Sequence, residues 1–293
     1  MPFANDHAES LAERLEQGEI LTFNPCPFGL PGEYDRAFLL AQRPGGRIHK
    51  DITFNPDRES TTGYVLKSVA QAARLHGILR GFAQASADWL SRLFPRYAAR
   101  WQLDRVSFHT EEEATRKLRL TARNDLLHVD AFPSRPTRGR RILRLFVNIN
   151  PTDPRVWATS ITLDKVFERH GRQLGLTDLR SHRWSWRLGQ GLLNLFQPGA
   201  AQRTPYDSFM LRLHRFLKTS DNFQERSPRR LWYLPSGSAW LLFSDGVCHA
   251  DLRGQYAIDQ SFFIPQDALA LPDASPFALF NRACKSAILS QAA

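Results

Sequence analysis

The stretch Leu126-Leu127-His128-Val129-Asp130-Ala131-Phe132 places a histidine and an aspartate two residues apart in a mostly apolar run. Alternate residues of a β-strand point to the same face, so a strand here would set the imidazole of His128 beside the carboxylate of Asp130. Such a pair supplies two ligands of a 2-His-1-carboxylate triad, which holds Fe(II) and leaves coordination positions open. Because H-x-D is common by chance, a surface strand end with two polar residues remains the alternative.

A third candidate ligand, His249, lies in a matching context. Residues 236–245 read as a turn, a short apolar strand and a second turn, and residues 254–265 read as another strand that ends at a proline. We therefore predict a metal centre of His128, Asp130 and His249. Asp245 is a candidate for a hydrogen-bond partner behind His249, with an ordinary turn aspartate as the alternative.

The segment 141–151 decides what faces the interior. One set of alternate residues is wholly apolar, and the other set mixes Ile142 and Phe146 with Arg144 and Asn148. A half-buried sheet would turn the mixed face to solvent, whereas a barrel around a polar site would turn it inward and cover the apolar face with helices. We predict the barrel, with Arg144 and Asn148 near the metal. Arg144 could bind a carboxylate through its planar fork, and a surface arginine is a nearly equal alternative.

The order in which helix-like and strand-like spacings of apolar residues follow one another predicts an α+β protein with one catalytic domain over 1–293. An N-terminal extension spans 1–63, with a strand-like piece at 37–40. Supporting helices span 64–101, the second of them about 85–101. Strands span 102–160 and 231–265, including one at 117–121. A helical insertion spans 162–219, and a closing helix spans 275–291. Because the proposed ligands are divided between the two groups of strands, these groups should form one sheet system.

Composition narrows the partners. The formal charge is +10 and the pI about 10.0, which indicates an anionic partner. Three cysteines without a paired spacing suit a reducing compartment. The acidic N-terminus is not a signal peptide, and no apolar run approaches the ~20 residues that span a bilayer. We expect a cytoplasmic protein and leave peripheral membrane contact open. Nucleic-acid binding is disfavoured, because the arginines are scattered and no known module is present.

These residues resemble the Fe(II)/2-oxoglutarate-dependent dioxygenases. The resemblance implies a double-stranded β-helix, a jelly-roll or cupin-like fold flanked by helices. It also implies Fe(II) on His128, Asp130 and His249, with 2-oxoglutarate as cosubstrate and O2 as oxidant. Many members carry a basic residue about ten positions after the distal histidine, where this chain has Asp259-Gln260-Ser261. Arg144 is therefore our candidate for the cosubstrate carboxylate, and Ser261 could add a hydroxyl.

The chain also resembles the 3-deoxy-D-manno-oct-2-ulosonic acid (Kdo) 3-hydroxylases of Gram-negative bacteria, through residues 127–136, 141–151, 209–214 and 254–265. This resemblance implies hydroxylation of C3 of Kdo in the lipopolysaccharide inner core, on Kdo-lipid A, with peripheral contact to the inner membrane. Arg135, Arg138 and Arg140 could then meet the sugar carboxylate or lipid phosphates. A solvated basic loop is the alternative for each of them.

Three rival functions stay open. The same chemistry could act on another anionic substrate or on a peptide, which a basic surface would also suit. A jelly roll could bind sugar acids or lipids without catalysis, although an intact triad argues against it. A nucleic-acid-binding protein is suggested by charge alone. The remaining histidines, among them His109 and His214, are interpreted as structural or surface residues.

Overall fold

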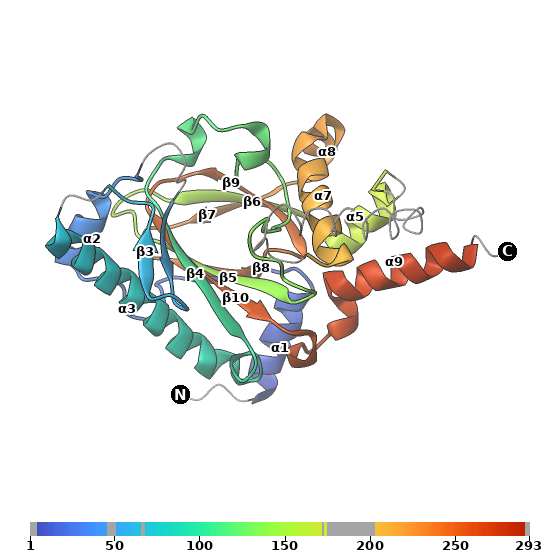
Figure 1. Cartoon of the computed structure of the whole chain (residues 1–293), viewed down its shortest axis with the longest axis horizontal. Helices are drawn as coiled ribbons and strands as arrows, with labels where there is room; N and C mark the ends of the chain where they lie inside the picture. The colour runs from blue at the N-terminus through green and yellow to red at the C-terminus, as the bar shows by residue number, and fades with distance from the viewer. Residues whose placement is uncertain (1–4, 46–50, 66–67, 172, 175–202, 291–293) are drawn as a thin grey trace, which may run out of the picture.

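Two antiparallel sheets form the centre of the molecule (Figure 1). The computed structural model describes residues 5–45, 51–65, 68–171, 173–174 and 203–290. The larger sheet has seven strands in the order β1-β8-β5-β10-β4-β2-β3, and the smaller has three in the order β7-β6-β9. Helices lie on the outside of both sheets, so the prediction of an α+β protein is confirmed.

The strand bounds show how the two halves of the sequence interleave. The larger sheet contains β1 (Leu21–Phe23), β2 (Ile52–Asn55), β3 (Ser60–Thr62), β4 (Gln102–His109), β5 (Arg141–Asn148), β8 (Ala239–Phe243) and β10 (Ala257–Ile264). The smaller sheet contains β6 (Arg155–Thr162), β7 (Arg230–Leu234) and β9 (Val247–Arg253). In both sheets, strands that precede the helical segment pair with strands that follow it: β5 lies between β8 and β10, and β6 between β7 and β9. The two groups of strands are therefore combined, as expected, although they form two sheets and not one.

Strand β5 has the two faces that its sequence predicts. Leu143, Leu145 and Val147 are buried in the core that also contains residues of the long helix α3 (Val69–Leu93). The opposite face points into the space between the sheets, where Phe146 stacks on Trp240 at 5.2 Å and meets the edge of Trp157 at 4.6 Å. The mixed face of the strand is therefore the inner one.

The N-terminal half differs from prediction in three places. Residues 37–40 belong to helix α2 (Glu33–Leu40), whose first turn carries two acids that favour a helix N-terminus. Helix α3 continues to Leu93, so no separate helix begins at 85, and Pro95 opens the short helix α4 (Pro95–Ala98). Residues 117–121 have no buried side chain and form no strand. The alternation of apolar and polar residues predicted a strand, but the segment pairs with no neighbouring strand among the described residues.

The C-terminal helices gather beside the smaller sheet, at the right of Figure 1, and share a buried apolar cluster with residues of β6 and β9. These helices are α5 (Leu163–His170), α7 (Pro205–Thr219), α8 (Asp221–Arg226) and α9 (Pro276–Ser290), while α1 (Asn5–Glu16) lies near the larger sheet. The predicted helical insertion is present at both of its ends, and residues 175–202 lie outside the described part. No helix among the described residues is both long and apolar enough to cross a membrane.

Helix α7 begins with a capping box that also holds a loop near the site. Thr204 Oγ1 accepts a hydrogen bond from the Asp207 amide, and Asp207 Oδ2 accepts one from the Thr204 amide. Asp207 Oδ1 accepts a further bond from the Arg138 amide at 3.0 Å. We expect Asp207→Ala to lower the free energy of unfolding by about 1–2 kcal/mol in urea titrations. Ser208→Ala, one residue later, should change it little, and equal losses would contradict the capping role.

Candidate metal centre

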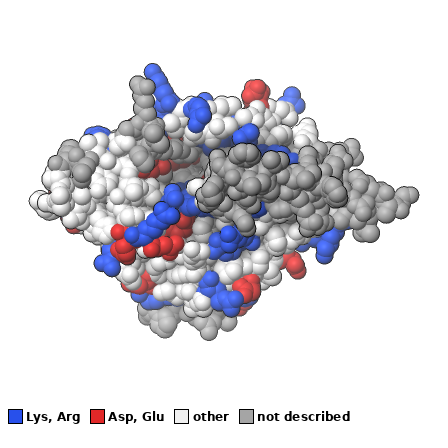
Figure 2. All heavy atoms as spheres, viewed as in Figure 1, with Lys and Arg blue, Asp and Glu red and all other residues white. Residues whose placement is uncertain are grey.

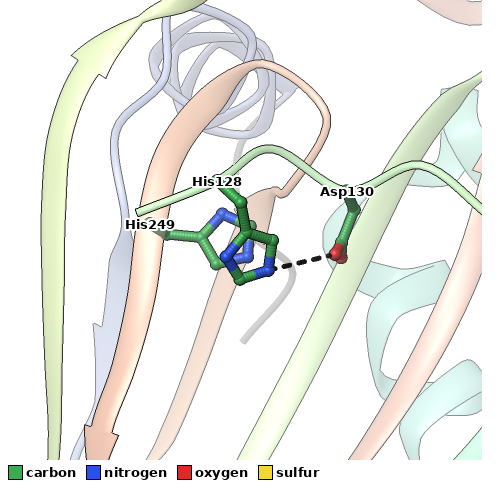
Figure 3. A group of neighbouring side chains, drawn as sticks. All are labelled: His128, Asp130 and His249. Atoms are coloured by element: carbon green, nitrogen blue, oxygen red, sulfur yellow. Dashed lines mark ion pairs between the residues drawn. The ribbon is translucent and has the colours of Figure 1, made fainter. Parts of the chain in front are cut away.

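Three predicted ligands meet between the two sheets (Figure 3). His128, Asp130 and His249 are buried, and one ligand atom from each lies within 4.8 Å of the others. We had predicted a β-strand for the H-x-D segment, but the structure has no strand there. The segment forms a single bridge in which His128 and His249 exchange backbone hydrogen bonds of 3.0 and 2.8 Å. The Asp130 amide then bonds to the Ser244 carbonyl at 2.8 Å, so the segment spans from β9 to the end of β8.

The backbone determines which nitrogen of each histidine can bind a metal. His128 Nδ1 lies 2.7 Å from the Leu126 carbonyl, and His249 Nδ1 lies 3.0 Å from the Val247 carbonyl. A carbonyl oxygen only accepts, so both Nδ1 atoms carry the proton and both Nε2 atoms keep a lone pair. Burial lowers the pKa of both imidazoles, which keeps them neutral. Neutral imidazole is the form that ligates metals, so the pair fits a metal ion.

Asp130 is ionised and offers one oxygen. Burial alone would raise its pKa, but the Arg144 guanidinium outweighs burial and brings the pKa below its usual range. Oδ2 accepts a hydrogen bond from Arg144 Nη1 at 2.9 Å. Oδ1 lies 3.7 Å from His128 Nε2 (Figure 3). Two imidazole nitrogens and one carboxylate oxygen therefore face the same point, which is the donor set of a facial triad.

The triad lies in the wall of a cavity of about 350 Å³. Trp157 forms part of the wall and stacks on His249 at 5.5 Å with an interplanar angle of 7°. Besides the triad, the charged and imidazole-bearing residues of the wall are Asp51, His109, Arg135, Arg144, His214, Lys218 and Asp251. The cavity therefore joins a metal site to a pocket of mixed charge, in which Arg135, Arg144 and Lys218 supply positive charge for an anionic ligand.

The family model for 3-deoxy-D-manno-oct-2-ulosonic acid (Kdo) hydroxylase matches residues 2–287. The chain belongs to the Kdo hydroxylase family. A search of the curated proteins found no match.

Solved structures agree with this membership. The Kdo hydroxylase KdoO in complex with alpha-ketoglutarate (2-oxoglutarate) and Fe(III) is 31% identical over 97% of this chain and 92% of that chain, with a TM-score of 0.84. The cobalt(II) complex of KdoO is 32% identical with the same coverage and a TM-score of 0.85. KdoO is described as a non-heme Fe(II) alpha-ketoglutarate-dependent dioxygenase.

In this member of the Kdo hydroxylase family, only some of the predicted cosubstrate residues line the cavity. Arg144 lines the cavity, as expected, but three of its nitrogens already contact Asp130 and Asp259. Its contact with 2-oxoglutarate stays a prediction. Ser261 is buried opposite Arg144 in the β5–β10 register and does not line the cavity.

The prediction for Asn148 is wrong. Its amide donates to the carbonyls of Asp153 and Leu234, both at 3.0 Å, and its oxygen accepts from the Asn150 amide at 3.0 Å. Asn148 is the last residue of β5, so it holds the following turn and does not reach the cavity.

The arginines after the H-x-D motif separate. Arg135 lines the cavity, lies 3.9 Å above the Phe132 ring and pairs with Asp104. Arg138 is exposed and is held by its backbone amide to Asp207. Arg140 donates to the Thr137 carbonyl and to Gln102, away from the cavity. A cluster in the sequence is therefore not a cluster in space, and Arg135 alone of the three remains at the cavity.

Asp245 does not support His249. Its carboxylate accepts from Arg141 Nε at 3.1 Å, and His249 Nδ1 is occupied by the Val247 carbonyl. The prediction of an acid behind the distal histidine is corrected accordingly: a backbone carbonyl orients the ring.

Three cavity residues were missed by sequence reasoning. His214 and Lys218 stand one turn apart on α7, and His214 Nδ1 lies 2.7 Å from the Val129 carbonyl. His109, on β4, bonds to two carboxylates. The four-residue spacing of His214 and Lys218 places both on one helix face, which was the available signal. His109 has Glu111 two residues later, but the acids that its ring contacts are Asp51 and Asp259, which lie far away in sequence.

The charge of His109 predicts a pH dependence of stability. Burial would lower its pKa, but Asp51 and Asp259 raise it from 6.5 to about 9. A pKa raised on folding stabilises the protein fully below 6.5, and this contribution is lost as pH rises through about 9. We expect unfolding titrations to show a loss on the order of 1–3 kcal/mol over that window. His109→Gln should lack this slope, and an unchanged slope in the variant would contradict the assignment.

Proposed function

We propose that this chain is an Fe(II)- and 2-oxoglutarate-dependent hydroxylase acting on C3 of Kdo in Kdo-lipid A. The observation that carries the proposal is the buried triad, with two unprotonated Nε2 atoms and one carboxylate oxygen, in a chain that matches the Kdo hydroxylase model over residues 2–287. One solved KdoO structure contains 2-oxoglutarate and another contains succinate, each together with Fe(III), and these molecules are a cosubstrate and a product of this reaction type.

We further propose that the two sheets form a double-stranded β-helix, with the division of the chain into one catalytic domain and its helical additions kept as predicted. The antiparallel pairing and the position of the triad between the sheets support this interpretation.

The side chains divide the work. His128, Asp130 and His249 would hold the iron, which with O2 and 2-oxoglutarate supplies the oxidising power that hydroxylates the substrate and releases succinate and CO2. Trp157 and Phe146 close the cavity on the inner side and exclude water from it. Arg144, Arg135 and Lys218 bring positive charge to the cavity, where the cosubstrate and the sugar acid both carry carboxylates.

Arg135 is our candidate for the substrate carboxylate. Its side chain is largely buried, its Nε has no hydrogen-bond partner among the described residues, and burial together with Arg144 lowers its pKa only to about 10. We expect Arg135→Gln to lower turnover of Kdo-lipid A by about 10-fold or more, since a hydrogen bond to a charged group contributes ~1.5–3 kcal/mol. The slow consumption of 2-oxoglutarate without substrate should persist. Arg138→Gln is the control. If Arg135→Gln lost turnover of Kdo-lipid A and substrate-free consumption of 2-oxoglutarate to the same extent, a role in substrate binding would be contradicted.

Contact with the inner membrane would bring the cavity to the lipid. Basic side chains are spread over the face shown in Figure 2, and the net charge is +10. Each basic residue near an anionic surface adds ~1 kcal/mol within a Debye length of ~8 Å. Binding to anionic vesicles should therefore weaken as salt rises, and vesicles of neutral lipid should bind poorly.

The direct test uses the purified chain with Fe(II), 2-oxoglutarate and Kdo-lipid A. A gain of one oxygen on the Kdo residue, located by fragmentation mass spectrometry, is the expected result. Turnover with another anionic glycolipid or a peptide, and none with Kdo-lipid A, would keep the chemistry and overturn the substrate.

A further inference from the structure

Five side chains of alternating charge run from the triad to the opposite wall of the cavity. Asp130 Oδ2 accepts from Arg144 Nη1 at 2.9 Å, and Arg144 Nη2 lies 2.8 Å from Asp259 Oδ1. Asp259 Oδ2 lies 2.7 Å from His109 Nε2, and His109 Nδ1 lies 3.0 Å from Asp51 Oδ1. We name these five residues the charge chain.

The geometry of His109 determines its charge. Both ring nitrogens face carboxylate oxygens, which only accept hydrogen bonds when ionised, so both nitrogens carry protons. The ring is then an imidazolium between two carboxylates. Positive and negative groups alternate along the charge chain. Each of its three inner ions lies between two ions of opposite charge, and each of its two terminal carboxylates lies beside one of the two cations.

Burial makes the inner links rigid. The Asp259 side chain has no exposed surface, His109 is 8% exposed and Arg144 15% exposed. Asp259 uses one oxygen for Arg144 and the other for His109, so neither cation can move without leaving a buried carboxylate oxygen unpaired. Asp259 and His109 thus determine the position of the Arg144 guanidinium from the side away from the triad.

Arg144 in turn determines how Asp130 can ligate. With Oδ2 bonded to Arg144, only Oδ1 faces His128 Nε2. A carboxylate that binds through one oxygen occupies one coordination position and leaves the others open, whereas a bidentate carboxylate would occupy two.

We propose that Arg144, Asp259 and His109 are positioning residues that hold Asp130 as a one-oxygen ligand and thereby control metal affinity and coordination number. The inference rests on the metal centre of the proposed function. It gives Arg144 a role that exists before any cosubstrate binds, and it gives His109 a role two links away from the metal.

The test is cobalt(II) titration of the whole metal-free chain without 2-oxoglutarate, followed by visible absorption, because the band intensity of Co(II) reports its coordination number. Arg144→Lys keeps the charge but cannot bond Asp130 and Asp259 with one fork. We expect it to weaken Co(II) binding by about 10–100-fold, as for other partners of ligand residues. The spectrum should change as well. His109→Gln should weaken binding by a smaller factor, and it is the second variant should Arg144→Lys not fold.

Arg141→Lys is the matched control. Arg141 is on the same strand three residues earlier and is more deeply buried than Arg144. Its Nε donates to both carboxylate oxygens of Asp245, and neither residue contacts the triad. It should lose stability without losing Co(II) affinity.

The outcomes separate the two levels of inference. Wild-type affinity and spectrum in both Arg144→Lys and His109→Gln would overturn the charge chain as a positioning device. An equal loss in Arg141→Lys would make the effect one of general stability. Absence of Co(II) binding by the unaltered chain would overturn the metal centre itself, and the charge chain with it.

Discussion

Replacing His249 with alanine is expected to abolish iron binding and hydroxylation while the chain stays folded. The substitution removes one of three ligands from a site in which all three atoms lie within 4.8 Å. Two remaining ligands cannot hold Fe(II) in a defined geometry, so turnover should fall to the background rate. The backbone bridge between residues 128 and 249 does not depend on the side chain. Iron content by absorption, hydroxylation by mass spectrometry and unfolding in urea measure the three properties separately.

The same result is expected for His128→Ala and for Asp130→Ala. His76→Ala is the matched control, because His76 is a partly buried histidine that contacts Thr61 and Phe54 at the larger sheet and not the triad. It should keep iron and activity. Full turnover in any of the three triad variants would show that the residue is not a ligand.

Replacing Trp157 with alanine should have the second largest effect. Trp157 is 2% exposed, contacts Phe146 and Trp240 between the sheets, and stacks on His249. Truncating a buried tryptophan costs about 3–5 kcal/mol through lost burial and the cavity that remains. The ring of His249 would also lose the surface that holds its plane, so Co(II) affinity should fall in addition.

Trp240→Ala separates these two effects. Trp240 is fully buried in the same cluster and contacts Phe146 and Trp157, but it has no stacking contact with His249. Urea unfolding should show similar losses of stability for both variants, with the larger loss of Co(II) affinity in Trp157→Ala. Equal Co(II) affinities would mean that the stacking does not position His249.

The parts of the site that are encoded locally could be predicted from the sequence. H-x-D and the distal histidine lead to three side chains that do meet, and the parity of residues 141–148 indicated which face of β5 points inward. The H-x-D segment nevertheless is not a strand. Its geometry comes from one bridge to β9 and one bond to Ser244, and these contacts are between residues far apart in sequence.

The parts that depend on long-range pairing could not be predicted. Nothing near Arg144 in the sequence indicates Asp259, 115 residues away, and His109 meets its two acids only through the pairing of β4 with β10 and with the region of β2. Asn148 illustrates the reverse error, because its parity was right but its position at the strand end attaches it to a turn. The arginines at 135, 138 and 140 separate because backbone contacts of the loop, not charge, determine their directions.

The central claim is that the triad of this chain couples oxidation of 2-oxoglutarate to hydroxylation of Kdo-lipid A. The most direct measurement is turnover under isotopically heavy O2, with both products analysed by mass. We predict that one heavy oxygen atom enters the Kdo residue and the other enters succinate, and that both signals vanish in His249→Ala. Succinate formation without oxygen transfer to the lipid, or transfer that persists in His249→Ala, would contradict the account.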